Sequence, residues 1–222
     1  MSSTPLAGMG TGTIAYVLHQ IGLTSCFMTG VAPVTGAQQF AGRARTLRCL
    51  PTREDIAKAH QADRAADPHR VAIDHMPAGE VLVVDARGVR DAAVCGDLLA
   101  GRVKASGGAG IVTDGCVRDL PGLLKLEFPV FAGGVHAALF GTRHLGMAVN
   151  EPVACGGVLV MPGDVLVGDC EGVVVVPAAL EQKVAELCVE RDELDTFIAH
   201  KIEEGLPLAR AMWASSSTSK GT

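Results

Sequence analysis

Asp97 and the dipeptide Arg118-Asp119 are the residues whose types and spacing best suit chemistry on a small anion. Twenty residues lie between Asp97 and Arg118, about the length of a helix followed by a strand. Ligands of α/β proteins bind in the crevice outside the carboxyl ends of the strands. We therefore expect the two segments to meet at one edge of a sheet.

These residues carry the groups that bind a 2-oxo acid. Its carboxylate suits the planar fork of N–H donors on Arg118. Its ketone oxygen, once enolised, suits a hard cation such as Mg²⁺ or Mn²⁺. Asp119 is an oxygen ligand of the kind that Mg²⁺ takes, and Asp97 could orient the waters that the ion keeps.

The turn at Gly96 offers a second way to hold a carboxylate. If a helix begins there, the backbone amides of Leu98 and Leu99 are free to donate to an anion. Plainer interpretations exist as well, because an Arg-Asp dipeptide in a loop commonly forms a surface ion pair and Asp97 suits a helix N-cap. The N-cap role is compatible with ligand binding.

The cysteines and histidines give weaker signals. The seven cysteines are odd in number and form no CxxC pair, which predicts buried free thiols in a reducing cytoplasm. A nucleophilic role for Cys95 or Cys116 stays open as an alternative. His136 and His144 are predicted to be satisfied or exposed side chains, although Arg143 and His144, in the loop expected between residues 130 and 150, could meet a second carboxylate of the substrate.

Composition restricts the class of protein. The 222 residues are 48% hydrophobic and 4% aromatic, which predicts one core built from aliphatic side chains. The net charge of −5 gives no general attraction to nucleic acid or to anionic membranes. No apolar run approaches the length of about 20 residues that a transmembrane helix needs. No signal peptide is visible at the N-terminus, so we expect a cytoplasmic protein.

The hydrophobic pattern predicts one α/β domain with a mixed sheet over residues 1–212, because strands and helices alternate and a hairpin lies near the end. The predicted helices are 11–22, 53–70 with an end near Pro68, a helix starting near Gly96-Asp97 within 90–104, 120–127 and 178–204. The predicted strands are 36–48, 79–85, 107–113, 129–132 and 153–160, with a hairpin over 162–177. The low-complexity residues 213–222 are expected to be disordered.

Two stretches resemble a known family. The run GGAGIVTDGCVRDLPGLLKLEFPVFAGG (107–134) is similar to the signature region of the RraA-like family. The run VACGGVLVMPGDVLVGDCEGVVVVP (153–177) resembles its CGG…PGD…D-x-x-G-V-x-x-V-P stretch. This family includes 4-hydroxy-4-methyl-2-oxoglutarate aldolases, also called 4-carboxy-4-hydroxy-2-oxoadipate aldolases, and regulators of ribonuclease E activity. The resemblance implies a single domain of the swivelling β/β/α type that assembles into trimers or hexamers.

The resemblance also implies roles for individual residues. Aldolase members share an Asp, twenty intervening residues and then Arg-Asp, a pattern that Asp97, Arg118 and Asp119 match. By this likeness Arg118 binds the substrate's carboxylate and keto oxygen, and Asp119 ligates the divalent metal. Asp97 holds a water of the metal, while the amides of Leu98 and Leu99 cradle the carboxylate.

The family completes its site with an acidic residue from the C-terminal helix of a neighbouring subunit. The corresponding stretch here is RDELD, in which Glu193 and Asp195 are both candidates. The choice stays open because the usual Lys-Glu at the end of this stretch is Leu194-Asp195.

The resemblance implies a metal-dependent aldolase that cleaves a 4-hydroxy-2-oxo dicarboxylic or tricarboxylic acid to pyruvate, with oxaloacetate decarboxylation as a side activity. The alternative is a regulator that binds a ribonuclease through its surface. A third hypothesis, a methyltransferase, is disfavoured because no acidic, glycine-rich loop follows the first strand to hold S-adenosylmethionine. The intact set of Asp97, Arg118 and Asp119 favours the enzyme.

Overall fold

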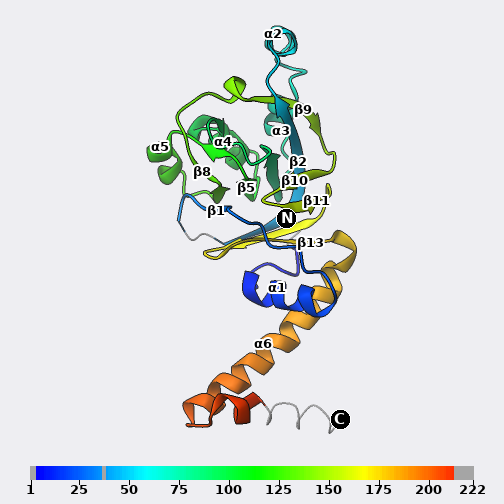
Figure 1. Cartoon of the computed structure of the whole chain (residues 1–222), viewed down its shortest axis with the longest axis vertical. Helices are drawn as coiled ribbons and strands as arrows, with labels where there is room; N and C mark the ends of the chain where they lie inside the picture. The colour runs from blue at the N-terminus through cyan, green and yellow to red at the C-terminus, as the bar shows by residue number, and fades with distance from the viewer. Residues whose placement is uncertain (1–3, 37–38, 213–222) are drawn as a thin grey trace.

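The described part of the chain, residues 4–36 and 39–212 of this computed structural model, alternates short strands and helices (Figure 1). The strands are β1 (Ala32–Pro33), β2 (Phe40–Pro51), β3 (Glu80–Asp85), β4 (Ala93–Cys95), β5 (Gly110–Thr113), β6 (Cys116–Val117), β7 (Val130–Ala132), β8 (Gly134–Val135), β9 (His144–Val149), β10 (Val153–Cys155), β11 (Val158–Val160), β12 (Val165–Asp169) and β13 (Gly172–Val176). The helices are α1 (Thr11–Gln20), α2 (Glu54–Ala62), α3 (Pro68–Asp74), α4 (Asp97–Ala105), α5 (Leu120–Lys125) and α6 (Glu181–Glu203), with 3₁₀ turns η1 (Phe140–Thr142) and η2 (Ala178–Leu180). The predicted tail at 213–222 lies outside the described residues.

The body of the protein is an eight-stranded mixed sheet in the order β1-β7-β5-β3-β2-β12-β13, with β9 also on β2. The strands β2, β3, β5 and β7 run parallel, and the others pair antiparallel to their neighbours. The long strand β2 joins the parts, because one edge pairs with β3 and the other with β12 and then β9. The expected single α/β domain with a mixed sheet is confirmed.

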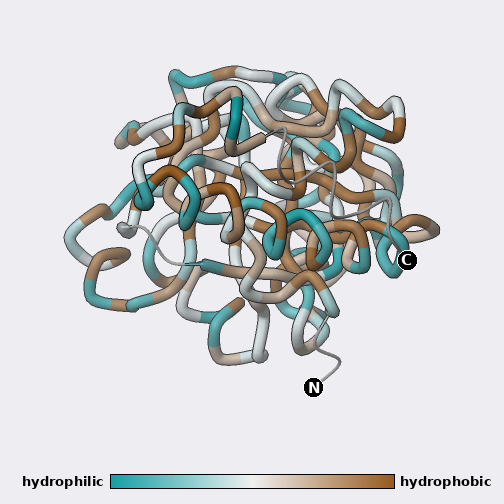
Figure 2. Tube along the Cα trace, turned by 90° about the horizontal axis from the view of Figure 1, so that it is seen from below, coloured by the Kyte–Doolittle hydropathy of each residue, from teal (hydrophilic) through white to brown (hydrophobic). Residues whose placement is uncertain are grey.

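Aliphatic side chains fill both faces of this sheet. Along β3, Leu82 and Val84 pack on the side that α3, α4 and α5 cover, whereas Val81 and Val83 pack on the side of the β10–β11 hairpin. A third cluster lies between the β12–β13 hairpin and the helices α1 and α6. Figure 2 shows hydrophobic stretches running through the middle of the view, interspersed with hydrophilic ones. No helix among the described residues is long and apolar enough to cross a membrane.

A second, three-stranded parallel sheet, β4-β6-β8, is the element that carries the candidate site. Each of its strands continues a strand of the main sheet after a short connection: β3 leads to β4, β5 to β6 and β7 to β8. Since β3, β5 and β7 are parallel, their continuations are parallel too, and their carboxyl ends lie together.

The prediction of one helix over 53–70 is wrong. The segment forms α2 and α3, separated by a break, and Pro68 begins a helix instead of ending one. Proline suits the first helical position because its missing N–H would have no partner there. Asp67 caps the new helix, and its carboxylate accepts the N–H of His69 at 3.0 Å.

The prediction of one strand over 153–160 is also wrong, since the segment folds back on itself as the hairpin β10–β11. The turn residues Gly156 and Gly157 have φ of +57° and +77°, which a residue with a side chain adopts only at a cost. In addition, β9 occupies part of the 130–150 region that was expected to be a loop.

Substitution of two glycines by alanine tests this packing, because one change should lower the stability of the protein and the other should raise it. A Cβ on Gly168 in β12 would collide with the ring of Phe40, approaching its Cδ1 and Cζ to 2.7 Å. Gly168→Ala should therefore destabilise the protein by about 1–3 kcal/mol. The matched variant Gly101→Ala, in the interior of α4 where the nearest atom is 3.8 Å away, should stabilise it by about 0.5–1 kcal/mol. Urea unfolding followed by circular dichroism measures both; loss of stability in both variants would contradict the packing.

Candidate active site at the ends of the small sheet

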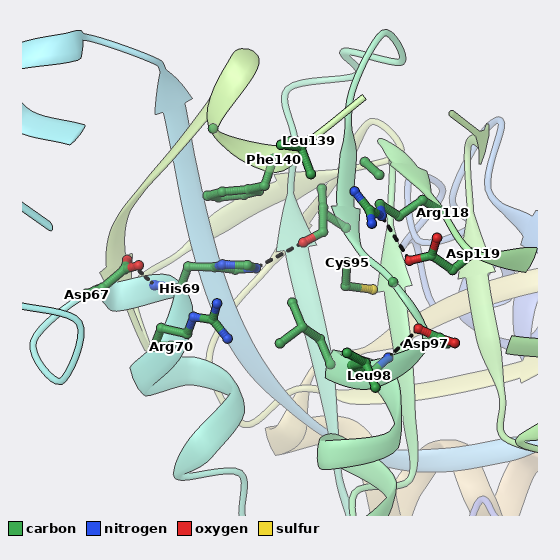
Figure 3. Close-up of a pocket in the computed structure, with 15 residues that line it drawn as sticks. Asp67, His69, Arg70, Cys95, Asp97, Leu98, Arg118, Asp119, Leu139 and Phe140 are labelled. Atoms are coloured by element: carbon green, nitrogen blue, oxygen red, sulfur yellow. Dashed lines mark hydrogen bonds and ion pairs between the residues drawn. The ribbon is translucent and has the colours of Figure 1, made fainter. Parts of the chain in front are cut away.

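A pocket of about 430 Å³ lies beyond the carboxyl ends of β4 and β6 (Figure 3). Its walls come from the start of α3, from β4 with the first turn of α4, from the turn after β6, and from η1. These segments are far apart in the sequence, so the pocket depends on the tertiary fold.

The pairing of β4 with β6 brings the two predicted segments together. The backbone N–H of Arg118 donates to the carbonyl of Cys95 at 3.0 Å, so Gly96-Asp97 and Arg118-Asp119 leave adjacent strand ends. The spacing therefore predicted a shared sheet edge correctly. The edge belongs to the small sheet and not to the main one, because β5 is interrupted at Asp114-Gly115 before β6 begins.

Arg118 and Asp119 form an ion pair that leaves part of each group available. The Nε of Arg118 donates to Oδ2 of Asp119 at 2.9 Å. Neither terminal nitrogen of the guanidinium, nor Oδ1 of the carboxylate, has a hydrogen-bond partner among the described residues. The two terminal nitrogens are thus free to meet a carboxylate, and the remaining oxygen is free to meet a cation.

Asp119 has an unusual backbone. Its φ of 57° and ψ of 42° lie in the left-handed region, which costs L-residues about 1–2 kcal/mol, somewhat less for Asp. It occupies the N-cap of α5, yet its side chain makes no capping hydrogen bond and turns toward Arg118 instead. Strained backbone of this kind gathers at functional sites, where the surrounding fold enforces it.

Two glycines make room for the two carboxylates. A Cβ on Gly96 would collide with Oδ2 of Asp119. A Cβ on Gly122 in α5 would collide with Oδ2 of Asp97 and would lie 2.7 Å from its Cβ and Cγ. Asp97 therefore packs against the helix that Asp119 begins, and Asp119 packs against the turn that precedes Asp97. Sequence reasoning missed Gly122; the signal was a glycine inside a predicted helix, where it lowers helix propensity.

The first turn of α4 is formed as predicted, with Gly96 at the N-cap and Asp97 as the first helical residue. The Leu98 N–H donates to Oδ1 of Asp97 at 2.7 Å, so this amide already has a partner. The Leu98 side chain is 85% exposed, while Leu99 packs against the core. Of the two amides expected to hold a carboxylate, Leu99 is the one that stays available at the pocket.

The opposite wall contains residues that sequence reasoning did not identify. His69 is buried, its Nε2 donates to the carbonyl of Val94 at 2.9 Å, and its ring stacks on Phe140 with centroids 4.0 Å apart. Burial lowers the pKa of His69 to about 4, so the ring is neutral at neutral pH. The missed signal was Asp67-Pro68-His69, which is typical of a capped helix start.

Arg70 follows His69 and extends its guanidinium from α3 toward the pocket (Figure 3). It makes no hydrogen bond or ion pair with any described residue. Arg143, in contrast, lies outside the pocket lining and pairs with Asp91 at 2.6 Å. His144 is buried behind Phe140 and does not line the pocket either.

Glu193 and Asp195 are not brought to this pocket within one chain. Both lie on α6, which projects from the end of the body opposite α2, away from α4 and α5 (Figure 1). Asp195 pairs with Arg191 one turn earlier, at 2.8 Å, and Glu193 is exposed. Their assignment to the site of a neighbouring subunit stays a prediction.

The cysteines near the site are unsuited to nucleophilic attack. Burial raises the pKa of Cys95 to about 12 and that of Cys116 above its ordinary value, which keeps both thiols protonated. All seven cysteines are free, and five are buried as expected; Cys26 is half-buried and Cys170 is exposed.

Fold and pocket together define a mixed α/β protein with paired charges over a small parallel sheet. The sequence pattern of the RraA-like family, described as Aldolase/RraA, matches residues 11–175. The chain belongs to the RraA-like family.

Individual relatives agree with this placement. A protein of Halalkalibacterium halodurans named "Putative 4-hydroxy-4-methyl-2-oxoglutarate aldolase" is 33% identical over 190 residues, covering 86% of this chain and 84% of its own. The crystal structure of Streptomyces coelicolor RraAS2, titled an unusual member of the RNase ES inhibitor RraA protein family, is 31% identical, with a TM-score of 0.77 over 87% of this chain and 92% of its own. An uncharacterized Pseudomonas syringae protein is 26% identical, with a TM-score of 0.80 over 93% of this chain and 94% of its own.

The buried His69 predicts a loss of stability in mild acid. Its pKa is about 4 in the folded protein and 6.5 in the unfolded chain, so between these values the unfolded chain binds a proton that the folded protein excludes. The free energy of unfolding should fall by on the order of 3 kcal/mol from this group as pH drops from about 6.5 to 4. His69→Gln should be less stable at pH 7 but show a shallower decline in urea unfolding from pH 7 to 4.5. An unchanged slope would refute the assignment.

Proposed function

We propose that this protein is a metal-dependent aldolase that cleaves a 4-hydroxy-2-oxo dicarboxylic or tricarboxylic acid to pyruvate, and that it also decarboxylates oxaloacetate. One observation carries the proposal: Arg118, Asp119 and Asp97 share one pocket, and two glycines make room for their carboxylates. The names of the relatives support a carbon–carbon lyase of this kind.

The donor set fits Mg²⁺ or Mn²⁺. Asp97 and Asp119 offer two hard carboxylate groups, and no third His, Cys, Asp or Glu side chain of the described residues joins them in a cluster that could hold a metal. Mg²⁺ commonly takes one or two carboxylates and keeps several waters, whereas a zinc site needs three or four protein ligands. When bound, the cation would supply positive charge at the substrate's keto oxygen.

Arg118 and the first turn of α4 would hold the 2-oxo acid end. The free terminal nitrogens of Arg118 donate to the carboxylate and to the keto oxygen, and the Leu99 amide donates to the carboxylate from the other side. As the C3–C4 bond breaks, its electron pair moves toward the keto oxygen. Arg118 then stabilises the negative charge that develops there, and this interaction lowers the free-energy barrier to cleavage of the C3–C4 bond.

Asp97 would steer the proton transfer. The 4-hydroxyl loses its proton to a water that Asp97 orients, C4 becomes the carbonyl of the leaving fragment, and C3 later takes a proton to give pyruvate. Decarboxylation of oxaloacetate breaks the equivalent C3–C4 bond and releases CO₂ in place of the carbonyl fragment. Arg118 and the Leu99 amide, which hold the pyruvyl end, therefore serve both reactions, whereas the proton transfer that Asp97 steers belongs to the cleavage of the 4-hydroxy acid.

We also propose a homotrimer or hexamer, in which Glu193 or Asp195 of an adjoining copy completes the site. The position of α6 supports this, since neither residue can reach the pocket of its own chain from the far end of the molecule (Figure 1).

A regulator of a ribonuclease is the second candidate function. The likeness to the Streptomyces coelicolor RraAS2 structure favours it, because that protein is described as an unusual member of the RNase ES inhibitor RraA protein family. Such a regulator needs no turnover in this pocket, so catalysis distinguishes the two functions.

Arg118→Ala and Asp119→Ala should each abolish pyruvate release, because one removes the donor to the keto oxygen and the other removes the metal ligand. Release is measured with oxaloacetate and Mg²⁺ by coupling to lactate dehydrogenase, and chelator should stop it in the parent protein. The control is Arg102→Ala with Asp74→Ala, which removes an Arg–Asp pair outside the pocket and should leave turnover unchanged. Full activity of either pocket variant, or the absence of chelator-sensitive pyruvate release by the parent protein, would refute the proposed aldolase activity.

Gly122→Ala should weaken metal binding without removing any ligand. The added methyl group occupies the place of the Asp97 side chain down to its Cβ, so rotation of the carboxylate alone does not relieve the contact. We expect the Mn²⁺ dissociation constant, measured by titration calorimetry, to rise about tenfold or more, in keeping with the loss of an orienting group. Gly101→Ala serves as the control on the neighbouring helix; equal Mn²⁺ affinity in both variants would contradict the role of Asp97.

A further inference from the structure

We propose that Arg70 binds a second carboxylate of the substrate, at the wall of the pocket opposite Arg118, and that it selects 2-oxo acids with two carboxylates over those with one. The inference rests on the proposed function, in which Arg118 and its neighbours hold the first carboxylate. It names a residue for the half of the substrate that the Arg-Asp motif does not specify.

The backbone that carries Arg70 is held in place relative to the Arg118 site. The residue before it, His69, is tied by its backbone N–H to Asp67 at 3.0 Å and by its ring to the carbonyl of Val94 at 2.9 Å. Val94 belongs to β4, the strand that ends at Gly96. The start of α3 and the start of α4 are therefore fastened to the same strand, and the two binding ends cannot move independently.

None of the described residues pairs with the charge of Arg70. The acidic group nearest in the sequence, Asp67, accepts the N–H of His69 and lies 3.9 Å from the ring of His60. Arg70 sits in the first turn of α3, where the helix dipole disfavours a cation. A half-buried cation without a partner costs free energy, and a bound anion would offset that cost.

The space between the two charged ends is apolar. Leu98 lies between Asp97 and Arg70, and Leu139 and Phe140 border the same space (Figure 3). At about 30 Å³ per water, the 430 Å³ pocket has room for on the order of ten waters, more than a pyruvyl group fills. Charged ends separated by an apolar middle suit a short carbon chain with a carboxylate at each end.

The first experiment compares two substrates that differ only at the far end. These are 4-hydroxy-2-oxoglutarate and 4-hydroxy-2-oxopentanoate, which carries a methyl group in place of the distal carboxylate; both release pyruvate when C3–C4 breaks. Arg70→Met should lower kcat/KM for the dicarboxylate by about tenfold to a hundredfold and change that for the monocarboxylate by less than about twofold. Arg70→Lys should restore part of the difference, because it returns a charge without the fork. Arg143→Met, outside the pocket, should change neither value.

The second experiment does not depend on turnover. Titration calorimetry with Mg²⁺ compares 2-oxoglutarate with 2-oxopentanoate, which lack the 4-hydroxyl and cannot be cleaved. The parent should bind 2-oxoglutarate about tenfold or more tightly than 2-oxopentanoate, and Arg70→Met should lose this preference. If the parent cleaves neither 4-hydroxy acid but shows this Arg70-dependent preference, the proposed aldolase activity is refuted, while the proposed binding site for a second carboxylate is supported.

Two results would overturn the role of Arg70. One is an unchanged preference in Arg70→Met. The other is an equal loss for both members of either pair, which would mark a structural contact. If the oligomer size on gel filtration falls as well, that contact is with a carboxylate of a second copy of the chain.

Discussion

The hydrogen-bonded pairing of β4 with β6 is the constraint on which the candidate site depends. It places the first turn of α4 beside the turn that begins α5, with the Arg118 amide on the Cys95 carbonyl. Every other feature of the site follows from that closeness: the left-handed backbone of Asp119, the two glycines that admit the carboxylates, and the open side of the Arg118 guanidinium. Without this pairing, the same side chains would be solvated surface charges.

The pairing is itself set by the main sheet. The buried strands β3 and β5 are parallel neighbours. The chain therefore leaves both strands at the same edge of the main sheet and in the same direction. The second wall of the pocket arises differently. It comes from α3, which is attached to β4 through the buried ring of His69 and therefore keeps a fixed distance from the first wall.

Much of this arrangement could be predicted from the sequence where local and tertiary preferences agree. The spacing from Asp97 to Arg118 matches a helix and a strand, and the Gly96-Asp97 start of α4 follows from ordinary helix-start rules. The second wall could not be predicted, because the polar segment 53–70 has the composition of one exposed helix. Its break at Asp67-Pro68 and the burial of His69 depend on partners, Val94 and Phe140, that are distant in the sequence. Arg70 belongs to this second wall, so the sequence did not indicate it as a carboxylate-binding residue. The sequence indicated Arg143 instead, and the structure places Arg143 outside the pocket.

The small sheet is built from strands of three, two and two residues, whereas β2 of the main sheet has twelve. The larger sheet thus supplies most of the hydrophobic core. The small sheet adds only a few buried residues, such as Val94 and Val117, and the reactive groups sit at its ends. Substitutions at the strand ends can change which molecule is bound without disturbing strand register in the larger sheet. Such a separation makes the architecture permissive to evolutionary change of role. It gives a physical reason why one family contains proteins named for cleaving a carbon–carbon bond and proteins named for restraining a ribonuclease.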